Sequence, residues 1–383
     1  MNKNTLLFSP LTIAGATLKN RVVISPMCTY SCAGDGLATN WHLVHLGKFA
    51  LGGAAVVCAE ATAVEARGRI THGDLGLWSQ AHTDAFKPIT AFIKASGALP
   101  AIQIAHAGRK ASMQRPWESN GPIYPEDQLP GDPPWPTVAA SAVPVRDGWP
   151  VPNELSVSDI RSVQQSFATT AQRALEAGFE ILEIHSAHGY LAHSFLSPLS
   201  NRRTDGYGGG LAGRMRFTLE TAEQVRAVWP ASKPLFVRIS SVDIDGSSEG
   251  WQLADSAALA VELKSRGVDV IDCSSGGIAG LATAAIGPQP LGFRIPYADH
   301  IRRASGMLAM TVGLILRPEQ AEAALQSGSA DLIAIGREAL YDPFWPLHAA
   351  HELGADPEFG QWPEAYGWWL VRREALLRQI GEV

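Results

Sequence analysis

Residues 156–190 read SVSDIRSVQQSFATTAQRALEAGFEILEIHSAHGY. The first part has apolar residues at helical spacing, opens with Ser and Asp in positions suited to capping a helix, and closes on Gly178. Residues 179–185 are a short apolar run that ends in a histidine. A helix followed by a buried strand is the repeating unit of α/β folds. This stretch therefore predicts one such unit, with polar side chains where its strand ends.

Similar apolar runs recur along the chain, and helical patterns separate several of them. Continuous apolar strands separated by helices indicate a parallel sheet that is covered on both faces. An open, doubly wound sheet usually has GxGxxG after its first strand, whereas the first run here continues into SPMCTY. We therefore expect a closed (β/α)₈ TIM barrel of the α/β class. The predicted strands are 22–27, 54–61, 100–106, 179–185, 234–240, 268–274, 307–313 and 331–336.

Residues 107–155 interrupt this alternation and contain 10 of the 25 prolines. They follow the third predicted strand, so in a barrel they would lie over the C-terminal rim, where TIM-barrel sites are built. Long loops in compact domains are usually lids or binding loops. We expect a lid-like insertion within one domain spanning 1–383. The tail at 361–383 is aromatic and then basic, which is typical of a terminal helix packed on the barrel.

Composition and charge exclude several classes of protein. The net charge is −6 and no long run of Lys and Arg occurs, so no nucleic-acid-binding surface is predicted. No signal peptide and no stretch of eighteen apolar residues is found, which predicts a cytoplasmic protein outside the membrane. The four cysteines are scattered and none form CxxC, so neither a disulfide framework nor an iron–sulfur cluster is expected.

Polar or reactive residues end nearly every predicted strand. A barrel brings these strand ends together at one rim. Each residue alone could be a satisfied buried polar group, but together they predict a site. The residues are Cys28, Glu60, Gln103, His106, His185, His188, Arg238, Ser274, Gly313, Gly336 and Arg337.

The segment from His185 to Tyr190 is the densest of these groups, with two imidazoles and a phenol. Two imidazoles could bind zinc, but a zinc site needs a third protein ligand, and none is obviously paired with them. They could instead donate hydrogen bonds to a carbonyl oxygen that gains charge in a transition state. Tyr190 could then protonate carbon as a general acid.

Arg238 ends the fifth predicted strand, where burial of its charge requires an anionic partner. That partner could be a ligand such as a reduced flavin, or an internal carboxylate, Glu183 or Asp272. Gly313 and Gly336 end the last two strands, and barrels frequently bind phosphate at these two loops. The glycines, with Arg337, therefore indicate a phosphorylated ligand of cofactor size.

These residues fall in motifs that cover nearly the whole chain. In them the chain resembles the Old Yellow Enzyme family of FMN-dependent ene-reductases, and more closely its bacterial xenobiotic reductase branch. The block at 185–209 is the most specific. The motifs are KNRVVISPMCTYS, WH..H.G..A.GG (41–53), EATAVEARGRIT, QIAHAGRKAS, HSAHGYLAHSFLSPLSNRRTDGYGG, VRIS and AIGREAL.

The resemblance implies FMN as the cofactor and assigns residues to each part of it. Cys28 would tune the flavin and would not attack substrate. Arg238 would face N1 and O2 of the ring system, and Gly313, Gly336 and Arg337 would hold the phosphate. The full set of implied FMN contacts is Ser25, Pro26, Met27, Cys28, Ala61, Gln103, Arg238, Gly313, Gly336 and Arg337.

The resemblance also implies the reaction. NADPH, or NADH, would reduce FMN and leave, and an enone, maleimide or nitro compound would take its place. Hydride would pass from flavin N5 to the β-carbon. His185 and His188 would bind the carbonyl oxygen, Tyr190 would protonate the α-carbon, and Tyr30 would contact the substrate from the other side.

The chain departs from the branch at two places. Val312 stands where xenobiotic reductases have a Trp before the glycine of the seventh strand, which would widen the pocket. In that branch the C-terminal segment reaches a neighbouring subunit's active site, and here Trp369 is the candidate residue. The resemblance thus implies a homodimer or a dimer of dimers.

Two other functions stay open on sequence grounds. One is a metal-dependent hydrolase on the same barrel, which would use His185, His188 and a carboxylate such as Glu183. The other is a flavin-binding protein without catalysis, although binding the cofactor would not require Tyr190 and the two histidines.

Overall fold

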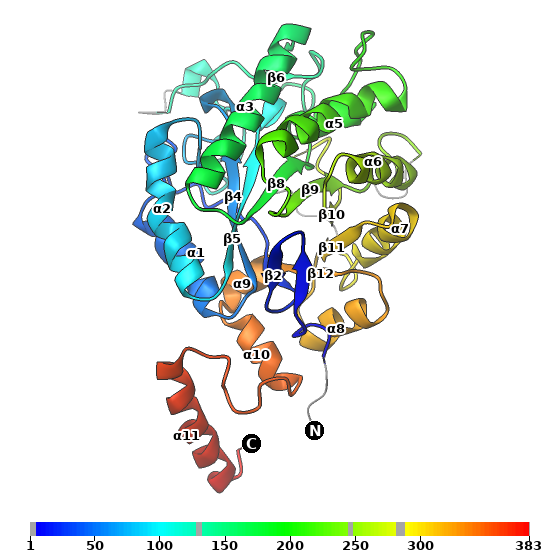
Figure 1. Cartoon of the computed structure of the whole chain (residues 1–383). Coiled ribbons are helices and arrows are strands. Elements are labelled where there is room, and N and C mark those ends of the chain that lie inside the picture. The colour runs from blue at the N-terminus through cyan, green and yellow to red at the C-terminus, as the bar shows by residue number, and fades with distance from the viewer. Residues whose placement is uncertain (1–4, 128–131, 244–247, 281–287, 383) are drawn as a thin grey trace.

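The computed structural model describes residues 5–127, 132–243, 248–280 and 288–382. Eight parallel strands close into a barrel, with β12 pairing back onto β3, and helices surround it (Figure 1). The predicted TIM barrel is therefore confirmed, and every predicted strand is present with ends shifted by up to three residues. The strands are β3 (Val22–Ile24), β4 (Val56–Ala63), β5 (Leu99–Ala105), β8 (Ile181–Ser186), β9 (Leu235–Ser240), β10 (Val270–Ser274), β11 (Leu308–Val312) and β12 (Leu332–Ile335).

Helices connect consecutive strands on the outside of the barrel. The helix before β8 begins at a capping box, in which Ser156 and Asp159 each bond the other's backbone N–H, as the opening sequence predicted. It also buries an apolar stripe that includes Ile160 and Phe167. The outer helices are α1 (Asn40–Leu51), α2 (Gln80–Ala95), α3 (Val157–Glu176), α5 (Leu211–Val228), α6 (Leu253–Ser265), α7 (Ile295–Ser305) and α8 (Pro318–Gln326).

Side chains fill the barrel interior, and a hairpin closes its N-terminal end. The hairpin joins β1 (Leu11–Ile13) and β2 (Ala16–Leu18), and no sequence pattern had indicated it. Its residues Ile13 and Leu18 are buried against inward-facing side chains from the barrel strands, such as Val23 and Phe236. The interior is therefore a packed core and not a pore, and only the opposite end can hold a site.

The insertion at 107–155 is ordered where it is described, and residues 128–131 lie outside the described part. It contains two short 3-10 helices, η2 (Gly108–Lys110) and η3 (Pro125–Asp127), and a two-residue strand, β6 (Val138–Ala139), which pairs with β7 (Asn153–Glu154). The buried guanidinium of Arg109 donates to three backbone oxygens, one of them Ile278 O at 2.7 Å. This arginine ties the insertion to the loop that follows β10.

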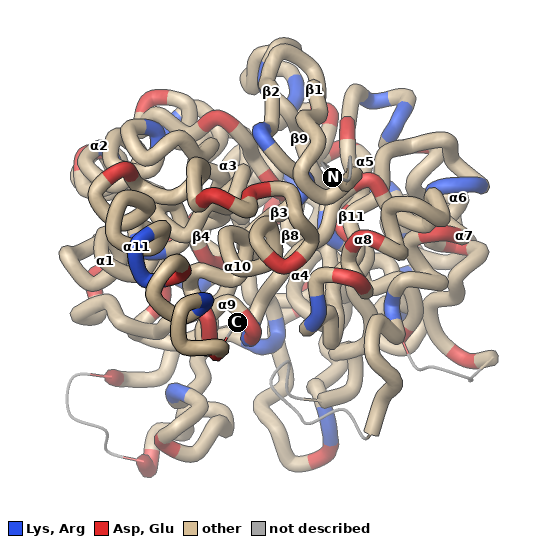
Figure 2. Tube along the Cα trace, turned by 90° about the horizontal axis from the view of Figure 1, so that it is seen from below, with Lys and Arg blue, Asp and Glu red and all other residues tan. Residues whose placement is uncertain are grey.

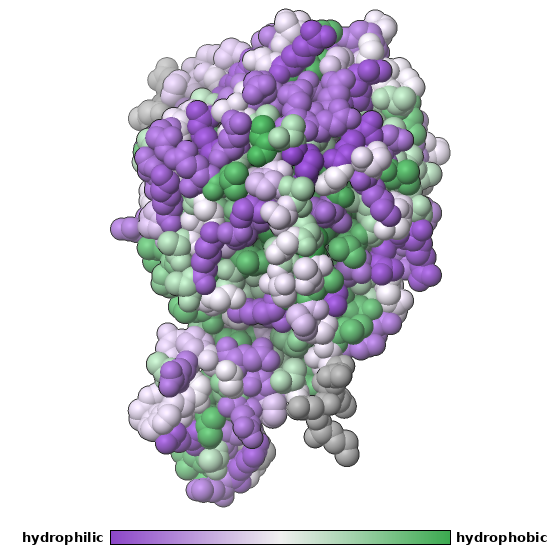
Figure 3. Space-filling view, viewed as in Figure 1, coloured by the Kyte–Doolittle hydropathy of each residue, from purple (hydrophilic) through white to green (hydrophobic). Residues whose placement is uncertain are grey.

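The C-terminal segment forms three helices, α9 (Arg337–Tyr341), α10 (Trp345–Glu352) and α11 (Glu364–Ile380). The tail does form the expected helix, but the expectation that it packs on the barrel is wrong. Helix α11 stands off the body, below α10 and at the opposite end of the molecule from β6 (Figures 1 and 3). Only Gly367 of this helix is buried, and Trp369 is 65% exposed.

The surface shows no feature that would assign the protein to a membrane or a nucleic acid. Within the described residues no helix combines the length and the apolar character needed to cross a bilayer. On the face seen in Figure 2, acidic and basic residues are interspersed, without a broad basic surface. A cytoplasmic location stays a prediction.

Candidate active site

The strand register places several predicted site residues next to one another at the C-terminal end of the barrel. His185 of β8 pairs with Arg238 of β9, and Arg238 pairs with Asp272 of β10. Gln103 of β5 pairs with Glu183 of β8. Parallel strands in register bring their carboxyl ends to one rim, which is why residues far apart in the sequence meet here.

The segment after β3 lies against this group. Ser25 is buried, and its hydroxyl accepts a hydrogen bond from Arg238 Nη1 at 3.2 Å. Pro26 and Met27 follow it, and Met27 Sδ is near Gly336, across from β3. Tyr30 adopts a left-handed backbone conformation with φ of 51°, which turns the chain over the rim. Burial and the nearby Glu60 and Asp74 raise the pKa of the Cys28 thiol. The thiol therefore stays protonated, and it is not a nucleophile because only a thiolate attacks.

The end of β4 carries a register shift that places Glu60 and Ala61 beside this segment. The shift relative to β5 lies between Ala59 and Thr62, and such bulges often re-aim side chains next to active sites. Glu60 Oε2 accepts the backbone N–H of Thr29 at 2.8 Å, while its Oε1 has no partner within the described residues. Burial raises the pKa of Glu60 to about 8, so the carboxyl is mostly protonated at pH 7.

Replacing Glu60 by Gln tests this protonation. Folding raises the pKa of Glu60 from 4.5 to about 8. Between these two pH values the folded state therefore binds more protons than the unfolded state, and the free energy of unfolding falls as pH rises. Glu60→Gln removes that titration. We expect its advantage in Tm over the wild type to grow by a few degrees from pH 5 to pH 8. A Tm difference that is independent of pH would contradict the assignment.

His185, His188 and Tyr190 form one cluster. The ring centroids of His185 and His188 are 5.1 Å apart, and those of His185 and Tyr190 are 5.0 Å apart, both edge to face. The backbone turns sharply between them, because His188 and Gly189 both have positive φ, of 60° and 76°. Gly189 is required at its position, since a Cβ there would lie 2.4 Å from Gly277 O.

Hydrogen bonds fix how the two imidazoles present their protons. His185 Nδ1 accepts the backbone N–H of Ala187 at 3.1 Å, so the ring proton lies on Nε2. His188 Nε2 is 2.7 Å from Ser274 Oγ, which is buried. If Ser274 donates this bond, His188 carries its proton on Nδ1. Burial and the nearby Arg238 lower both histidine pKa values, so both rings are neutral donors at pH 7.

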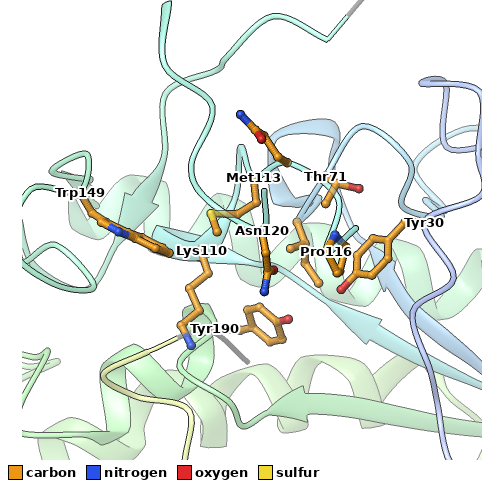
Figure 4. A pocket seen from close by; sticks show the side chains of 10 residues that line it. Tyr30, Thr71, Lys110, Met113, Pro116, Asn120, Trp149 and Tyr190 are labelled. Carbon is orange, nitrogen blue, oxygen red and sulfur yellow. The ribbon is translucent and has the colours of Figure 1, made fainter. Parts of the chain in front are cut away.

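Tyr190 lies at the N-terminus of α4 (Leu191–Leu196) and lines a small cavity at this rim. In Figure 4 the hydroxyl ends of Tyr190 and Tyr30 face each other. Burial raises the pKa of Tyr190 well above its usual value, so it retains its proton at all physiological pH values. Six of the ten lining residues belong to the 107–155 insertion, and these are Lys110, Met113, Gln114, Pro116, Asn120 and Trp149.

Lys110 is a site residue that sequence reasoning missed. Its Nζ donates to the backbone oxygens of His188, at 2.8 Å, and of Gly277. It also lies 5.9 Å from the centroid of the Tyr190 ring. Burial lowers the pKa of Lys110 to about 7. The lysine therefore braces the left-handed turn that holds His188 and Tyr190, and its place in the QIAHAGRKAS motif was the only available signal.

A group of arginines lies toward the ends of β11 and β12. Gly313 has a φ of 121°, and a Cβ there would approach Arg294 Nη1 at 3.3 Å. Arg337 follows Gly336. Among the described residues, Ser25 and Met27 alone would come within 4 Å of a Cβ at Gly336. The charges of Arg238 and Arg337, together with burial, lower the pKa of Arg294 to about 10. Sequence reasoning missed Arg294, and three guanidinium groups this close favour an anionic ligand.

The remaining predictions concern the ion pair of Arg238, the residues His106 and Trp369, and a metal site. Arg238 Nε is 3.3 Å from Asp272 Oδ2, so the internal ion pair considered from the sequence is present as well. His106 Nε2 pairs with Glu65 at 3.0 Å, away from the cavity. Trp369 does not line this chain's own cavity. Within the described residues no three His, Cys, Asp or Glu side chains are close enough to hold a metal, so the hydrolase hypothesis gains no support.

Comparisons with known proteins agree with this geometry. The model of the NADH:flavin oxidoreductase / NADH oxidase family matches residues 6–356. An NADPH dehydrogenase of Geobacillus sp. (strain WCH70) is 45% identical over 351 residues, covering 91% of this chain and 95% of the relative. An NADPH dehydrogenase of Bacillus subtilis (strain 168) is 43% identical over 351 residues, covering 91% and 96%.

Solved structures point the same way. An old yellow enzyme homologue from Zymomonas mobilis superposes with a TM-score of 0.74 at 26% identity, covering 90% of this chain and 92% of its own. The resemblance seen in the sequence motifs is thereby confirmed. The chain belongs to the NADH:flavin oxidoreductase / NADH oxidase family as an Old Yellow Enzyme-like member, an FMN-dependent oxidoreductase that takes electrons from a nicotinamide dinucleotide.

Proposed function

We propose that this enzyme uses NADPH to reduce the activated C=C bond of α,β-unsaturated carbonyl compounds and related nitro compounds. The observation that carries the proposal is the cluster of two neutral imidazoles and a protonated phenol with ring centroids about 5 Å apart. The naming of relatives as NADPH dehydrogenases supports NADPH over NADH as the reductant.

The residues at the rim fit FMN. The guanidinium of Arg238, whose Nε faces Asp272, and the amide of Gln103 provide donors for the pyrimidine edge of the ring system. The backbone at Gly336, which carries no side chain, and the guanidinium groups of Arg294 and Arg337 suit a phosphate. Ser25, Pro26, Met27, Cys28 and Ala61 would line the ring, and Gly313 would allow close approach of the ribityl phosphate. The chemistry that bound FMN supplies is hydride transfer, from NADPH and then to the β-carbon of the substrate.

The chain's own residues then act on the substrate. His185 and His188 donate hydrogen bonds to the carbonyl or nitro oxygen and stabilise the negative charge that grows there. Tyr190 gives its proton to the α-carbon, and its raised pKa keeps that proton available. Tyr30 lines the same cavity and would contact the substrate from the other side. An alkene without such an oxygen gains nothing from the histidines, so it should not react.

Separating the two half-reactions tests this proposal. Anaerobic holoenzyme is first titrated with NADPH, or with NADH in parallel, and bleaching of the flavin absorbance is followed. The reduced enzyme is then mixed with 2-cyclohexenone, and we expect the absorbance to return as the ring C=C is reduced. A flavin that is reduced by NADPH but is not reoxidised by any enone, maleimide or nitroalkene would favour the flavin-binding protein without catalysis.

Val312 gives a prediction about substrate size. This residue ends β11 at the top of the barrel interior and is 8% exposed. A Trp at this position would fill space near the ring system. We expect Val312→Trp to lower kcat/KM for bulky cyclic enones several-fold more than for 2-cyclohexenone. An unchanged ratio of the two rates would show that residue 312 does not set the size of the pocket.

We infer that the chain works as a homodimer or a dimer of dimers. Helix α11 exposes Trp369, at 65%, and Ile380, at 62%, and contiguous exposed apolar side chains usually mark an interface. A neighbouring subunit would receive this helix, and Trp369 is the residue proposed to reach its cavity. Sedimentation of the full chain and of a chain ending at residue 360 tests this, because loss of α11 should give monomers.

The insertion at 107–155 is proposed to act as a lid. It already supplies one wall of the cavity, and Arg109 anchors it at one end. Residues 116–120, beside the cavity, are held less tightly, because several of their side chains are exposed. Closure over a bound substrate would exclude water from the proton transfer.

A further inference from the structure

Two buried carboxyl groups lie in the barrel directly beneath the proposed flavin contacts. Glu183 is 2% exposed and Asp272 is 0% exposed. Asp272 is the register neighbour of Arg238, and Glu183 is the register neighbour of Gln103. Neither carboxyl has been given a role in the proposed reaction, although each touches a residue that would contact the flavin.

The two carboxyls have different partners. Glu183 Oε1 accepts a hydrogen bond from Gln103 Nε2 at 2.7 Å. Asp272 Oδ2 lies 3.3 Å from Arg238 Nε, and the side chains of Asp272 and Glu183 are also hydrogen-bonded to each other. One acid is therefore bound to a neutral amide, whereas the other faces a full positive charge.

We propose that Asp272 carries the negative charge that offsets Arg238, and that Glu183 is the uncharged member of the pair and orients Gln103. This inference rests on the proposed function, because it concerns the charge presented to bound FMN. Both residues are positioning residues, since they act through Arg238 and Gln103.

Electrostatics favours this division. Two carboxylates buried side by side cannot both ionise, so one retains a proton. The acid next to the guanidinium gains more from its negative charge than the acid next to the amide. Burial and the charge of Asp272 raise the pKa of Glu183 to about 8, in agreement with this assignment. The remaining groups that face the pair are Arg294 and the neutral thiol of Cys58.

A charged Asp272 beside an uncharged Glu183 has a consequence for the cofactor. Arg238 stabilises negative charge on a reduced flavin, and a negative Asp272 behind it weakens that effect. Asp272 therefore keeps the reduction potential of the flavin lower than Arg238 alone would set it. A neutral Glu183 has little effect on the potential. Glu183 instead holds one N–H of the Gln103 amide toward the barrel interior. The second N–H and the oxygen of that amide then remain for the flavin ring system.

Midpoint potentials of the wild-type holoenzyme and of two variants test the inference at pH 7. Glu183→Gln should change the preference for the reduced flavin by no more than about threefold, which is about 15 mV for two electrons. Adding Asp272→Asn in that background should increase the preference at least tenfold, which is about 30 mV upward. The Glu183→Gln background is needed because Asp272→Asn alone would let Glu183 ionise in its place.

The reverse pattern, with a large shift from Glu183→Gln and a small one from the added Asp272→Asn, would overturn the assignment, and so would equal shifts. If the double variant does not fold, infrared spectra of the wild-type holoenzyme and Glu183→Gln decide instead. Glu60 contributes a carbonyl band of its own in both proteins. A second carbonyl band of a protonated buried acid should disappear in Glu183→Gln, and a spectrum that loses no band would place the proton on Asp272. A wild-type protein that binds no FMN would refute the proposed function, whereas these outcomes concern the carboxyl pair alone.

Discussion

Tyr190→Phe is expected to lower the rate of enone reduction by about 10²–10⁴-fold while leaving reduction of the flavin by NADPH unchanged. In the proposed mechanism the phenol supplies the proton to carbon, whereas the two neutral imidazoles donate hydrogen bonds to the substrate oxygen. Stopped-flow measurement of the two half-reactions separates these effects.

A matched control is Tyr207→Phe. Tyr207 is also buried, but its hydroxyl donates to Glu220 Oε2 at 2.7 Å on the outer helices, away from the cavity. This variant should keep both half-reactions. If Tyr190→Phe slows the reductive half-reaction as much as the oxidative one, the tyrosine is not acting as the proton donor.

His185→Ala should lower kcat/KM for enones by about 10²–10³-fold, the usual loss when one donor to a developing oxyanion is removed. The Nε2 proton of His185 is held toward the site by the bond from Ala187 N to Nδ1. His185→Asn offers an amide donor from the same position and should recover part of the loss. The measurement is steady-state kinetics with 2-cyclohexenone, accompanied by the dissociation constant of a phenol that mimics the substrate oxygen.

The pH profile provides a second criterion for His185. The lowered histidine pKa values mean that neither ring gains a proton above pH 6, so the wild-type rate should not change through histidine titration between pH 6 and 8. A rate that falls tenfold over this range with a midpoint near the ordinary histidine pKa would be incompatible with buried neutral donors.

Much of the fold followed from hydrophobic pattern alone. The eight barrel strands are almost entirely buried, so their runs of Val, Ile and Ala were visible in the sequence without any alternation. The site residues at the strand ends were found for the same reason, because the fold fixes where a strand end must lie. His185 pairs with Arg238, and Gln103 pairs with Glu183, at the strand ends where the barrel predicts them.

The features that were missed depend on tertiary contacts. The strands of the β1–β2 hairpin have three residues each, which is too short for a periodic pattern to be recognised. Lys110 and Arg294 lie outside the strands and reach the site through long side chains, so their sequence neighbours give no sign of their burial. The standing of α11 away from the barrel could not be predicted either, since its aromatic residues fit burial against any partner.

The hairpin beneath the barrel has a consequence for kinetics. Because Ile13 and Leu18 close the N-terminal end, we expect the nicotinamide donor and the proposed substrate to enter from the same rim and to bind there one after the other. The two reactants therefore compete, and an excess of either should slow turnover by occupying the entrance out of turn.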